Sequence, residues 1–337
     1  MIRSKRRLLL GSLLAAGIFI FSVPVDSAPF GIENETTVID QGGRRIEAKA
    51  GFRRVISLYG AHTENLFSLG ADDRISGVSR NEAYPEAALA KPVFSYHDDP
   101  EKFLAARPDL VLIRPMIDRG YPQLIRRLEK SGIVVASLQP GSVDEMYRYW
   151  KILGVLTGRS DAAEQMVQSF KNSVLRLRLL TESLSEKKRV YFEAIHRKMK
   201  TFSPESMAVF ALEAAGGINA ASDAKPVRGT NIAAYGKERI LSHADRIDVY
   251  LAQSGAMNRP SVSSIREEPG FTLIKAVREN RVHIIDEMIV SRPTYRLLEG
   301  IFEIGSILYP NKFTDGVRGE LKVGGETTRR RGDGETR

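Results

Sequence analysis

Residues 53–70, RRVISLYGAHTENLFSLG, decide the fold class. The apolar run at 55–58 suits one buried strand, and residues 63–69 have helical spacing and stop at Gly70, a residue type that often ends helices. A short buried strand that leads directly into a helix is the repeating unit of a parallel α/β sheet. We therefore predict an α/β protein.

The same alternation recurs in two blocks of the chain. In the first block the pattern predicts further strands at 75–78, 110–113 and 134–138, and helices at 101–106, 122–131 and 143–156. In the second it predicts strands at 190–193, 249–252 and 282–285. Helices are predicted there at 204–215, capped by Ser203, at 237–243, and at 293–308 with Pro293 as first residue.

One long helix is predicted between the blocks, at 161–184, where apolar residues recur at helical spacing without glycine or proline. At 1.5 Å per residue it would span roughly 36 Å, enough to cross two lobes. We expect two Rossmann-like α/β lobes bridged by this helix, with a ligand cleft between them. The expected divisions are a signal peptide (1–27), an N-terminal lobe (52–158), the connecting helix (159–186), a C-terminal lobe (187–312) and a disordered tail (313–337).

The first 27 residues have the order of a secretory signal. Four basic residues precede an apolar run at 8–23, and small residues follow around Ser27 and Ala28, where we predict cleavage. Removal would take away four positive charges and one negative charge, which lowers the formal charge from +9 to +6. A retained N-terminal anchor is the alternative, although a run of 16 residues is short for a membrane span.

Composition narrows the function classes. The chain has 337 residues, 42% hydrophobic and 27% charged, which is typical of a folded protein. It has no cysteine, which excludes disulfide scaffolds, thiolate metal sites, cysteine nucleophiles and a cysteine-linked lipid anchor. Phosphate-binding loops, dinucleotide fingerprints and common hydrolase motifs are absent, so we predict a protein that is not an enzyme. A spread positive charge without a basic aromatic motif does not favour nucleic acid.

Loops that follow predicted strands carry the candidate ligand-binding residues, because ligands of open α/β sheets bind beyond the carboxyl ends of the strands. These loops are rich in arginine, histidine and tyrosine, which suit a bulky anionic ligand or a metal chelate. Arg292 is singled out because it precedes the predicted start of a helix. The candidates are Tyr59, His62, Arg80, Asn81, Tyr96, His97, Arg114, His196, Arg259, Arg292, Tyr295 and Arg296.

Two glutamates occupy matching places in the two blocks. Glu101 and Glu238 each open a short helix that precedes a buried strand. A glutamate in a first helical turn also complements the helix dipole, which is the simpler structural explanation.

An ordered set of short motifs between about residues 52 and 312 resembles one family. It includes RVISL at 54–58, TENL at 63–66, Tyr84-Pro85, RPDLV at 107–111 and Gly216-Gly217. The chain resembles the periplasmic binding proteins of ABC importers for iron–siderophore, haem and cobalamin. The resemblance implies that Glu101 and Glu238 pair with arginines on the two permease subunits, and that Arg292 and the 79–84 loop face the ligand. The loops lack the aromatic residues expected of a corrin platform, which favours a ferric chelate or haem over cobalamin.

From this resemblance we expect a monomeric periplasmic protein that captures a ferric siderophore or haem-like chelate and delivers it to an inner-membrane permease dimer with its ATPase. It would have no intrinsic cofactor and perform no chemistry. Cobalamin, a free divalent metal or an oxyanion remain alternative ligands. An exported hydrolase is a more distant alternative.

Overall fold

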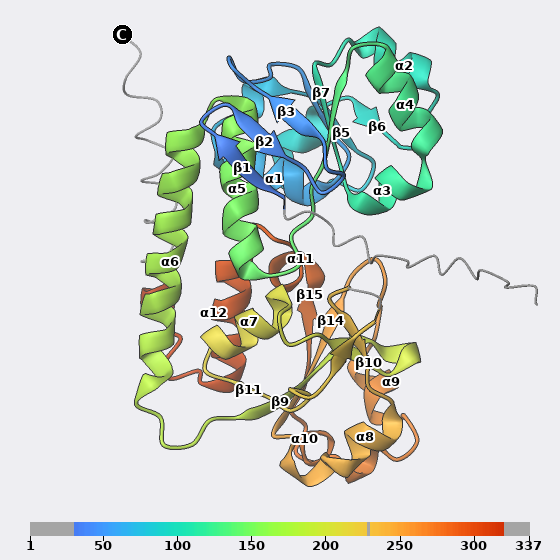
Figure 1. Cartoon of the computed structure of the whole chain (residues 1–337). Helices are drawn as coiled ribbons and strands as arrows, with labels where there is room; N and C mark the ends of the chain where they lie inside the picture. Colours follow the sequence, from blue (N-terminus) through green and yellow to red (C-terminus); the bar gives the residue numbers. More distant parts are fainter. Residues whose placement is uncertain (1–29, 228–229, 320–337) are drawn as a thin grey trace, which may run out of the picture.

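The computed structural model describes residues 30–227 and 230–319. Two α/β lobes lie one above the other, and a long helix runs along one side of both (Figure 1). The N-lobe contains strands β1 to β8 and the C-lobe contains strands β9 to β15. The two-lobed α/β fold predicted from the sequence is confirmed.

A parallel five-stranded sheet forms the centre of the N-lobe, in the order β6-β5-β4-β7-β8. Helices cover it, so strand β7 is buried along its whole length, which explains its continuous apolar sequence. The strands are β4 (Val55–Ser57), β5 (Ile75–Ser79), β6 (Val93–Phe94), β7 (Leu110–Ile113) and β8 (Val134–Ser137). The two-residue strand β6 was not predicted, since so short a run has no periodicity to detect.

The N-lobe helices are α1 (Gly60–Ser68), α2 (Pro100–Ala106), α3 (Pro115–Gly120), α4 (Pro122–Lys130) and α5 (Val143–Thr157), with 3₁₀ turns η1 (Asp72–Arg74) and η2 (Glu86–Ala90). Four of the N-lobe helices were predicted and differ only in their ends, whereas α3 was not predicted. Helix α1 begins three residues earlier than predicted, directly after Tyr59. Helix α5 is capped by the Ser142 side chain and ends at Gly158, which has a φ of 62°.

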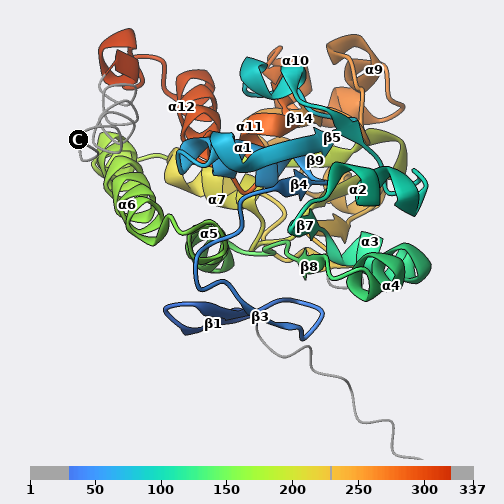
Figure 2. The ribbon, with the colours of Figure 1, turned by 90° about the horizontal axis from the view of Figure 1, so that it is seen from above.

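A small antiparallel sheet precedes the residues assigned to the N-lobe from sequence. It consists of β1 (Gly31–Asn34), β2 (Thr37–Ile39) and β3 (Arg45–Glu47) and lies against α5 (Figure 2). Val38 and Ile46 are buried in the core that the lobe shares with α5. The Asp40 carboxylate accepts a hydrogen bond from the Ser137 backbone N–H at 2.8 Å. The N-lobe therefore begins before residue 52, and the predicted boundary there is wrong.

The C-lobe sheet has the order β12-β13-β10-β9-β14-β15, with β11 also beside β9. Strands β9, β14 and β15 are parallel, whereas β10, β12 and β13 form an antiparallel edge. The strands are β9 (Arg189–Ile195), β10 (Lys200–Phe202), β11 (Ile218–Asn219), β12 (Lys225–Pro226), β13 (Ile232–Ala234), β14 (Val249–Ser254) and β15 (Val282–Asp286). Of these strands only β9, β14 and β15 were predicted.

The C-lobe helices correct two predicted starts. They are α7 (Met207–Ala214), α8 (Lys237–Ser242), α9 (Val262–Arg266), α10 (Lys275–Arg278), α11 (Glu287–Val290) and α12 (Leu297–Leu308), with 3₁₀ turns η3 (His196–Lys198), η4 (Ala244–Arg246) and η5 (Phe271–Leu273). Ser206, not Ser203, caps α7 by accepting a hydrogen bond from the Val209 N–H. Helix α12 begins at Leu297 rather than at Pro293, because the segment between them contacts the other lobe.

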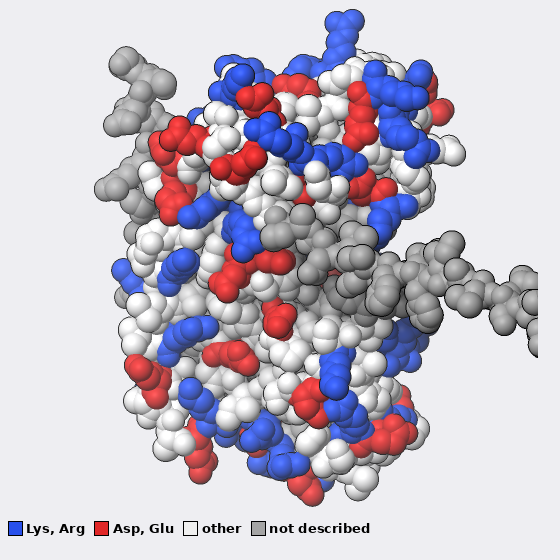
Figure 3. Space-filling model, viewed as in Figure 1, with Lys and Arg blue, Asp and Glu red and all other residues white. Residues whose placement is uncertain are grey.

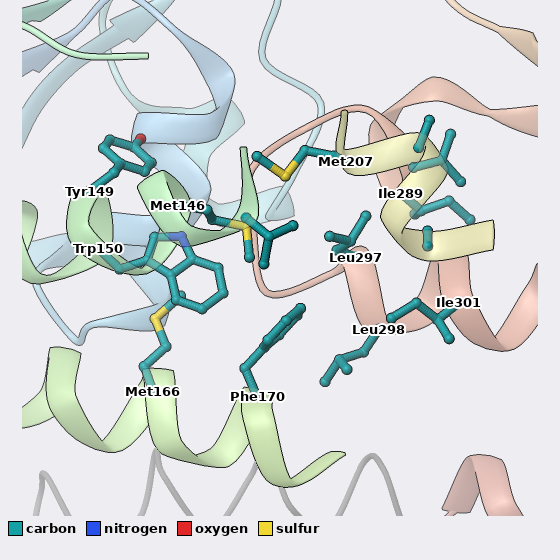
Figure 4. Packing of buried hydrophobic residues seen from close by; sticks show 14 of the residues in the cluster. Met146, Tyr149, Trp150, Met166, Phe170, Met207, Ile289, Leu297, Leu298 and Ile301 are labelled. Carbon is teal, nitrogen blue, oxygen red and sulfur yellow. The ribbon is translucent and has the colours of Figure 1, made fainter. Parts of the chain in front are cut away.

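Helix α6 (Ser160–Glu182) occupies nearly the range predicted for the connecting helix. It packs against α5 of the N-lobe and against α7 and α12 of the C-lobe. Figure 4 shows Trp150 of α5, Phe170 of α6 and Leu297 of α12 converging on one another. These residues belong to a single hydrophobic cluster that includes residues of both lobes. The lobes thus share part of their core along α6.

The end of the described chain corrects the predicted tail. Phe313 is buried against Phe302, with ring centroids 5.9 Å apart, and residues 315–319 are helical. Order therefore continues beyond residue 313. The remaining tail residues and the predicted signal peptide lie outside the described residues. None of the described helices has the length and apolarity needed to cross a membrane.

Candidate ligand-binding site

A pocket of about 520 Å³ opens at the carboxyl ends of β9 and β14 in the C-lobe, and we call it the C-lobe pocket. The 255–260 loop forms one wall. Asn258 fixes this loop, because its side chain donates to the Gln253 carbonyl at 2.9 Å and accepts from the His196 N–H at 3.0 Å. The lining residues are Ile195, His196, Arg197, Ala256, Met257, Asn258, Arg259, Pro260 and Ser264.

His196, a predicted site residue, lies in the wall of this pocket. Its Nδ1 is 2.8 Å from the buried Glu193 carboxylate, which also accepts a hydrogen bond from the Tyr250 hydroxyl. The hydrogen bond to Glu193 raises the pKa of His196 above its usual value, against the opposing effect of burial. The imidazole can therefore carry a positive charge beside the pocket.

Two arginines complete the charge of the pocket. Arg259 was predicted from its loop position, whereas Arg197 was not selected although it follows His196 directly. Both side chains are exposed, and neither forms an ion pair with another residue in the described parts of the chain. Met257, 63% exposed, adds an apolar surface. The pocket can thus bind an anionic group next to an apolar one.

The carboxyl ends of the N-lobe strands hold Tyr59 and Arg114. The Arg114 guanidinium lies 4.6 Å from the centre of the Tyr59 ring, and its Nη2 is 3.2 Å from the Met116 sulfur. Burial raises the pKa of Tyr59. The Arg114 Nε is buried without a hydrogen-bond partner among the described residues. The two predicted residues do come together, as a cation–π pair.

Tyr96 and His97 form an aromatic cluster with Tyr121, which the sequence did not single out. The Tyr96 ring lies 4.5 Å from His97 and 4.8 Å from Tyr121, and the Tyr121 hydroxyl is 3.2 Å from the His97 Nδ1. Tyr121 could not be recognised from spacing, because it comes from the junction of α3 and α4. His97 remains exposed at this place.

Arg80 and Asn81 lie exposed in the loop after β5. The neighbouring Glu82 holds this loop, since its carboxylate accepts hydrogen bonds from the backbone and side chain of Ser79. Neither Arg80 nor Asn81 forms a hydrogen bond or ion pair within the described ranges. The structure leaves both side chains accessible.

His62, which was predicted to contact a ligand, lies in the core of the N-lobe. It is fully buried, with Nδ1 2.6 Å from the Tyr149 hydroxyl and Nε2 3.2 Å from the Ile113 carbonyl oxygen. Burial lowers the pKa of His62 to about 3, so the ring is neutral. Both ring nitrogens therefore have hydrogen-bond partners inside the core.

Segment 291–296 joins the two lobes, and we call it the seam segment. The buried Glu64 carboxylate of α1 lies 3.2 Å from the Arg292 guanidinium and 3.7 Å from that of Arg296. The Pro293 carbonyl accepts hydrogen bonds from the Asn65 amide at 3.0 Å and the Trp150 indole at 3.1 Å. Among the groups in these contacts, the Arg292 and Arg296 side chains were predicted to bind the ligand.

Tyr295 and Arg296 likewise have partners inside the protein. The Tyr295 hydroxyl is 2.9 Å from the Ser169 hydroxyl of α6, and its ring packs on Phe170. Arg296 lies 4.2 Å from the centre of the Tyr84 ring, and its Nε donates to Glu299. The structure therefore gives Arg292, Tyr295 and Arg296 a structural role between the lobes.

Glu101 and Glu238 are exposed in the first turns of α2 and α8. Glu101 is 3.5 Å from Arg127, a long and exposed ion pair. Both neighbours of Glu238 have other partners, since Lys237 pairs with Glu268 and Arg239 with Asp223. Within the described ranges no cation pairs with Glu238, so its carboxylate is available to another molecule.

Where the structure describes the chain, no three histidine, aspartate or glutamate side chains gather as a metal site would require. On the face shown in Figure 3, basic and acidic residues are interspersed over both lobes.

The chain matches the periplasmic binding protein family over residues 55–288 and belongs to it. It is 26% identical over 291 residues to an uncharacterized ABC transporter substrate-binding lipoprotein of Bacillus subtilis, covering 83% of this chain and 87% of that protein. It is 21% identical over 258 residues to a vitamin B12-binding protein of Vibrio cholerae, covering 76% and 88%. Among solved structures, a possible iron-binding periplasmic protein of Staphylococcus epidermidis matches with a TM-score of 0.68 and 26% identity, covering 77% of this chain and 99% of that one.

This membership confirms the resemblance found in the sequence. The family consists of binding proteins, so the prediction that the chain is not an enzyme is also confirmed.

Proposed function

We propose that this protein is the periplasmic substrate-binding component of an ABC importer, and that it captures a ferric siderophore or a haem-like iron chelate. The C-lobe pocket carries this proposal, because it combines two exposed arginines, a histidine whose pKa is raised by Glu193 and an apolar methionine. Iron chelates of these kinds combine acidic arms with flat or apolar parts. The similarity to a possible iron-binding protein supports the same ligand class.

Arg114 and Tyr59 would contribute from the N-lobe, since they lie at the corresponding carboxyl edge of its sheet. Arg80, Asn81, Tyr96 and His97 are accessible and stay candidates for ligand contacts. Cobalamin is the second candidate ligand, favoured by the similarity to a vitamin B12-binding protein.

A titration followed by visible absorption tests the ligand class. Haem, a ferric catecholate, a ferric hydroxamate and cobalamin are added in turn to the purified protein. We expect a saturable shift with one of the three iron chelates. A shift with cobalamin alone would replace the iron assignment, and no shift with any of them would contradict both.

Replacing Arg259 tests the pocket itself. A charge-assisted hydrogen bond contributes about 1.5–3 kcal/mol, so Arg259→Gln should weaken binding by about ten- to a hundredfold. Arg266→Gln is the matched control, because Arg266 is an exposed arginine on α9 that does not line the pocket. Equal affinities of the two variants would exclude the pocket as the binding site.

Delivery is proposed to use Glu101 and Glu238, one from each lobe, against a permease dimer of two-fold symmetry, with the protein acting as a monomer. The variant Glu101→Ala, Glu238→Ala should keep its ligand affinity and lose the stimulation of ATP hydrolysis by the reconstituted permease and ATPase. The control is the double variant Glu86→Ala, Glu205→Ala, which also removes one exposed glutamate from each lobe, but outside α2 and α8. Loss of ligand affinity in the first variant would refute the docking role.

A further inference from the structure

A chain of charged side chains leads from the C-lobe pocket to helix α8. His196, in the pocket wall, is held by Glu193 on one side, and its Nε2 lies 3.9 Å from a carboxylate oxygen of Glu268 on the other. The second oxygen of Glu268 pairs with the ammonium group of Lys237. Glu268 thus stands between the imidazole of His196 in the pocket wall and the ammonium group of Lys237 on another element.

Lys237 is the first residue of α8, and Glu238, the proposed docking residue, is the second. Glu268 follows α9, which contributes Ser264 to the pocket. The packing beneath supports this link, because Ile240 of α8, Ile265 of α9 and Phe271 of η5 belong to one buried cluster. The pocket wall and α8 are therefore connected through both charge and packing.

We propose that Glu268 is a positioning residue that couples the charge in the C-lobe pocket to the first turn of helix α8. The inference rests on the proposed function only in assigning α8 to the permease-facing surface. An anion bound in the pocket would pair with the protonated His196 ring, and Glu268 would then interact mainly with Lys237. Since such coupling is reciprocal, a change at Lys237 must also change the proton affinity of His196.

Several groups around His196 set its charge. Glu193 from β9 and Glu268 favour the imidazolium, as does the Ser264 backbone of α9. Burial opposes it, and the cationic side chains that line the same pocket are Arg197 and Arg259. The Tyr250 hydroxyl shares the Glu193 carboxylate. Within this set, only Glu268 also contacts Lys237.

The pKa of His196, measured by NMR titration, tests the coupling without any ligand or permease. The chain has five histidines, and the ring signal of His196 is the one that disappears in His196→Gln. In Lys237→Met, Glu268 has one cation left, so the acid dissociation constant of His196 should fall by about two- to threefold. The control is Arg239→Met, which removes an arginine of α8 that pairs with Asp223 instead and should leave the titration unchanged.

A second variant distinguishes coupling through Glu268 from a direct electrostatic effect of Lys237 on His196. Glu268→Gln should itself lower the pKa of His196, and in its background Lys237→Met should lose most of its effect. An unchanged titration in Lys237→Met, or the same shift with and without Glu268, would overturn the proposal. Neither measurement involves transport, so an unchanged titration would not contradict the proposed function. Conversely, a negative transport assay would not contradict a measured coupling between Lys237 and His196.

Discussion

Trp150 offers the sharpest test of how the lobes are joined. It is the only tryptophan of the chain, it is fully buried, and it belongs to α5 of the N-lobe. Its indole N–H donates to the Pro293 carbonyl of the seam segment, and its ring packs edge-on against Phe170, with centroids 5.2 Å apart. The substitution Trp150→Phe removes the donor and part of the ring while it keeps an aromatic side chain.

The expected loss of stability has two parts. The hydrogen bond contributes about 1 kcal/mol, and not more, because the Pro293 carbonyl keeps its bond from Asn65 and is not left without a partner. The smaller ring leaves a partial cavity that costs about 1–2 kcal/mol, less than truncation to alanine would. The free energy of unfolding should therefore fall by about 2–3 kcal/mol, which corresponds to a Tm lower by about 5 °C in a chain of this size.

Urea unfolding followed by far-ultraviolet circular dichroism measures this change, since the variant has no tryptophan fluorescence. Tyr147→Phe is the control, because Tyr147 packs on the same rings and its hydroxyl has no hydrogen-bond partner among the described residues. We expect one cooperative transition, shifted in Trp150→Phe and nearly unchanged in the control. A loss below about 0.5 kcal/mol, or separate transitions of which only one shifts, would refute the shared core.

Two further predictions concern single side chains of the N-lobe. The pKa of His62 is about 3 in the folded protein and near 6.5 when unfolded, so its stabilising effect is complete above pH 6.5 and is lost as the pH falls towards 3. The free energy of unfolding should consequently drop more between pH 7 and pH 4.5 in the wild type than in His62→Gln, and equal drops would contradict the buried neutral ring. Arg44 pairs with Asp40, Asp118 and Glu129, which joins the small sheet to α3 and α4. Arg44→Met should cost about 2–3 kcal/mol in urea unfolding, whereas Arg45→Met, which breaks one exposed pair with Glu33, should cost less than about 0.5 kcal/mol.

The sequence by itself determined the fold class, the long helix and the family. Strand β7 and the first four residues of β14 are continuous apolar runs, and α6 has unbroken helical spacing, so burial and periodicity were visible along the chain. The same reasoning missed β6, β11 and β12, whose two residues are held by pairing with neighbours and not by a pattern of their own.

Only the tertiary structure decided what the strand-end residues do. His62, Arg292 and His196 all lie in loops after predicted strands, and all three were predicted as possible ligand residues. The fold buries His62 between Tyr149 and Ile113, engages Arg292 with Glu64 of the other lobe, and leaves His196 in the wall of a pocket beside Glu193. Their partners are distant in sequence or belong to another element. A side chain's role here depends on which charges and hydrogen-bonding groups the fold brings within a few ångströms, and local spacing does not encode that.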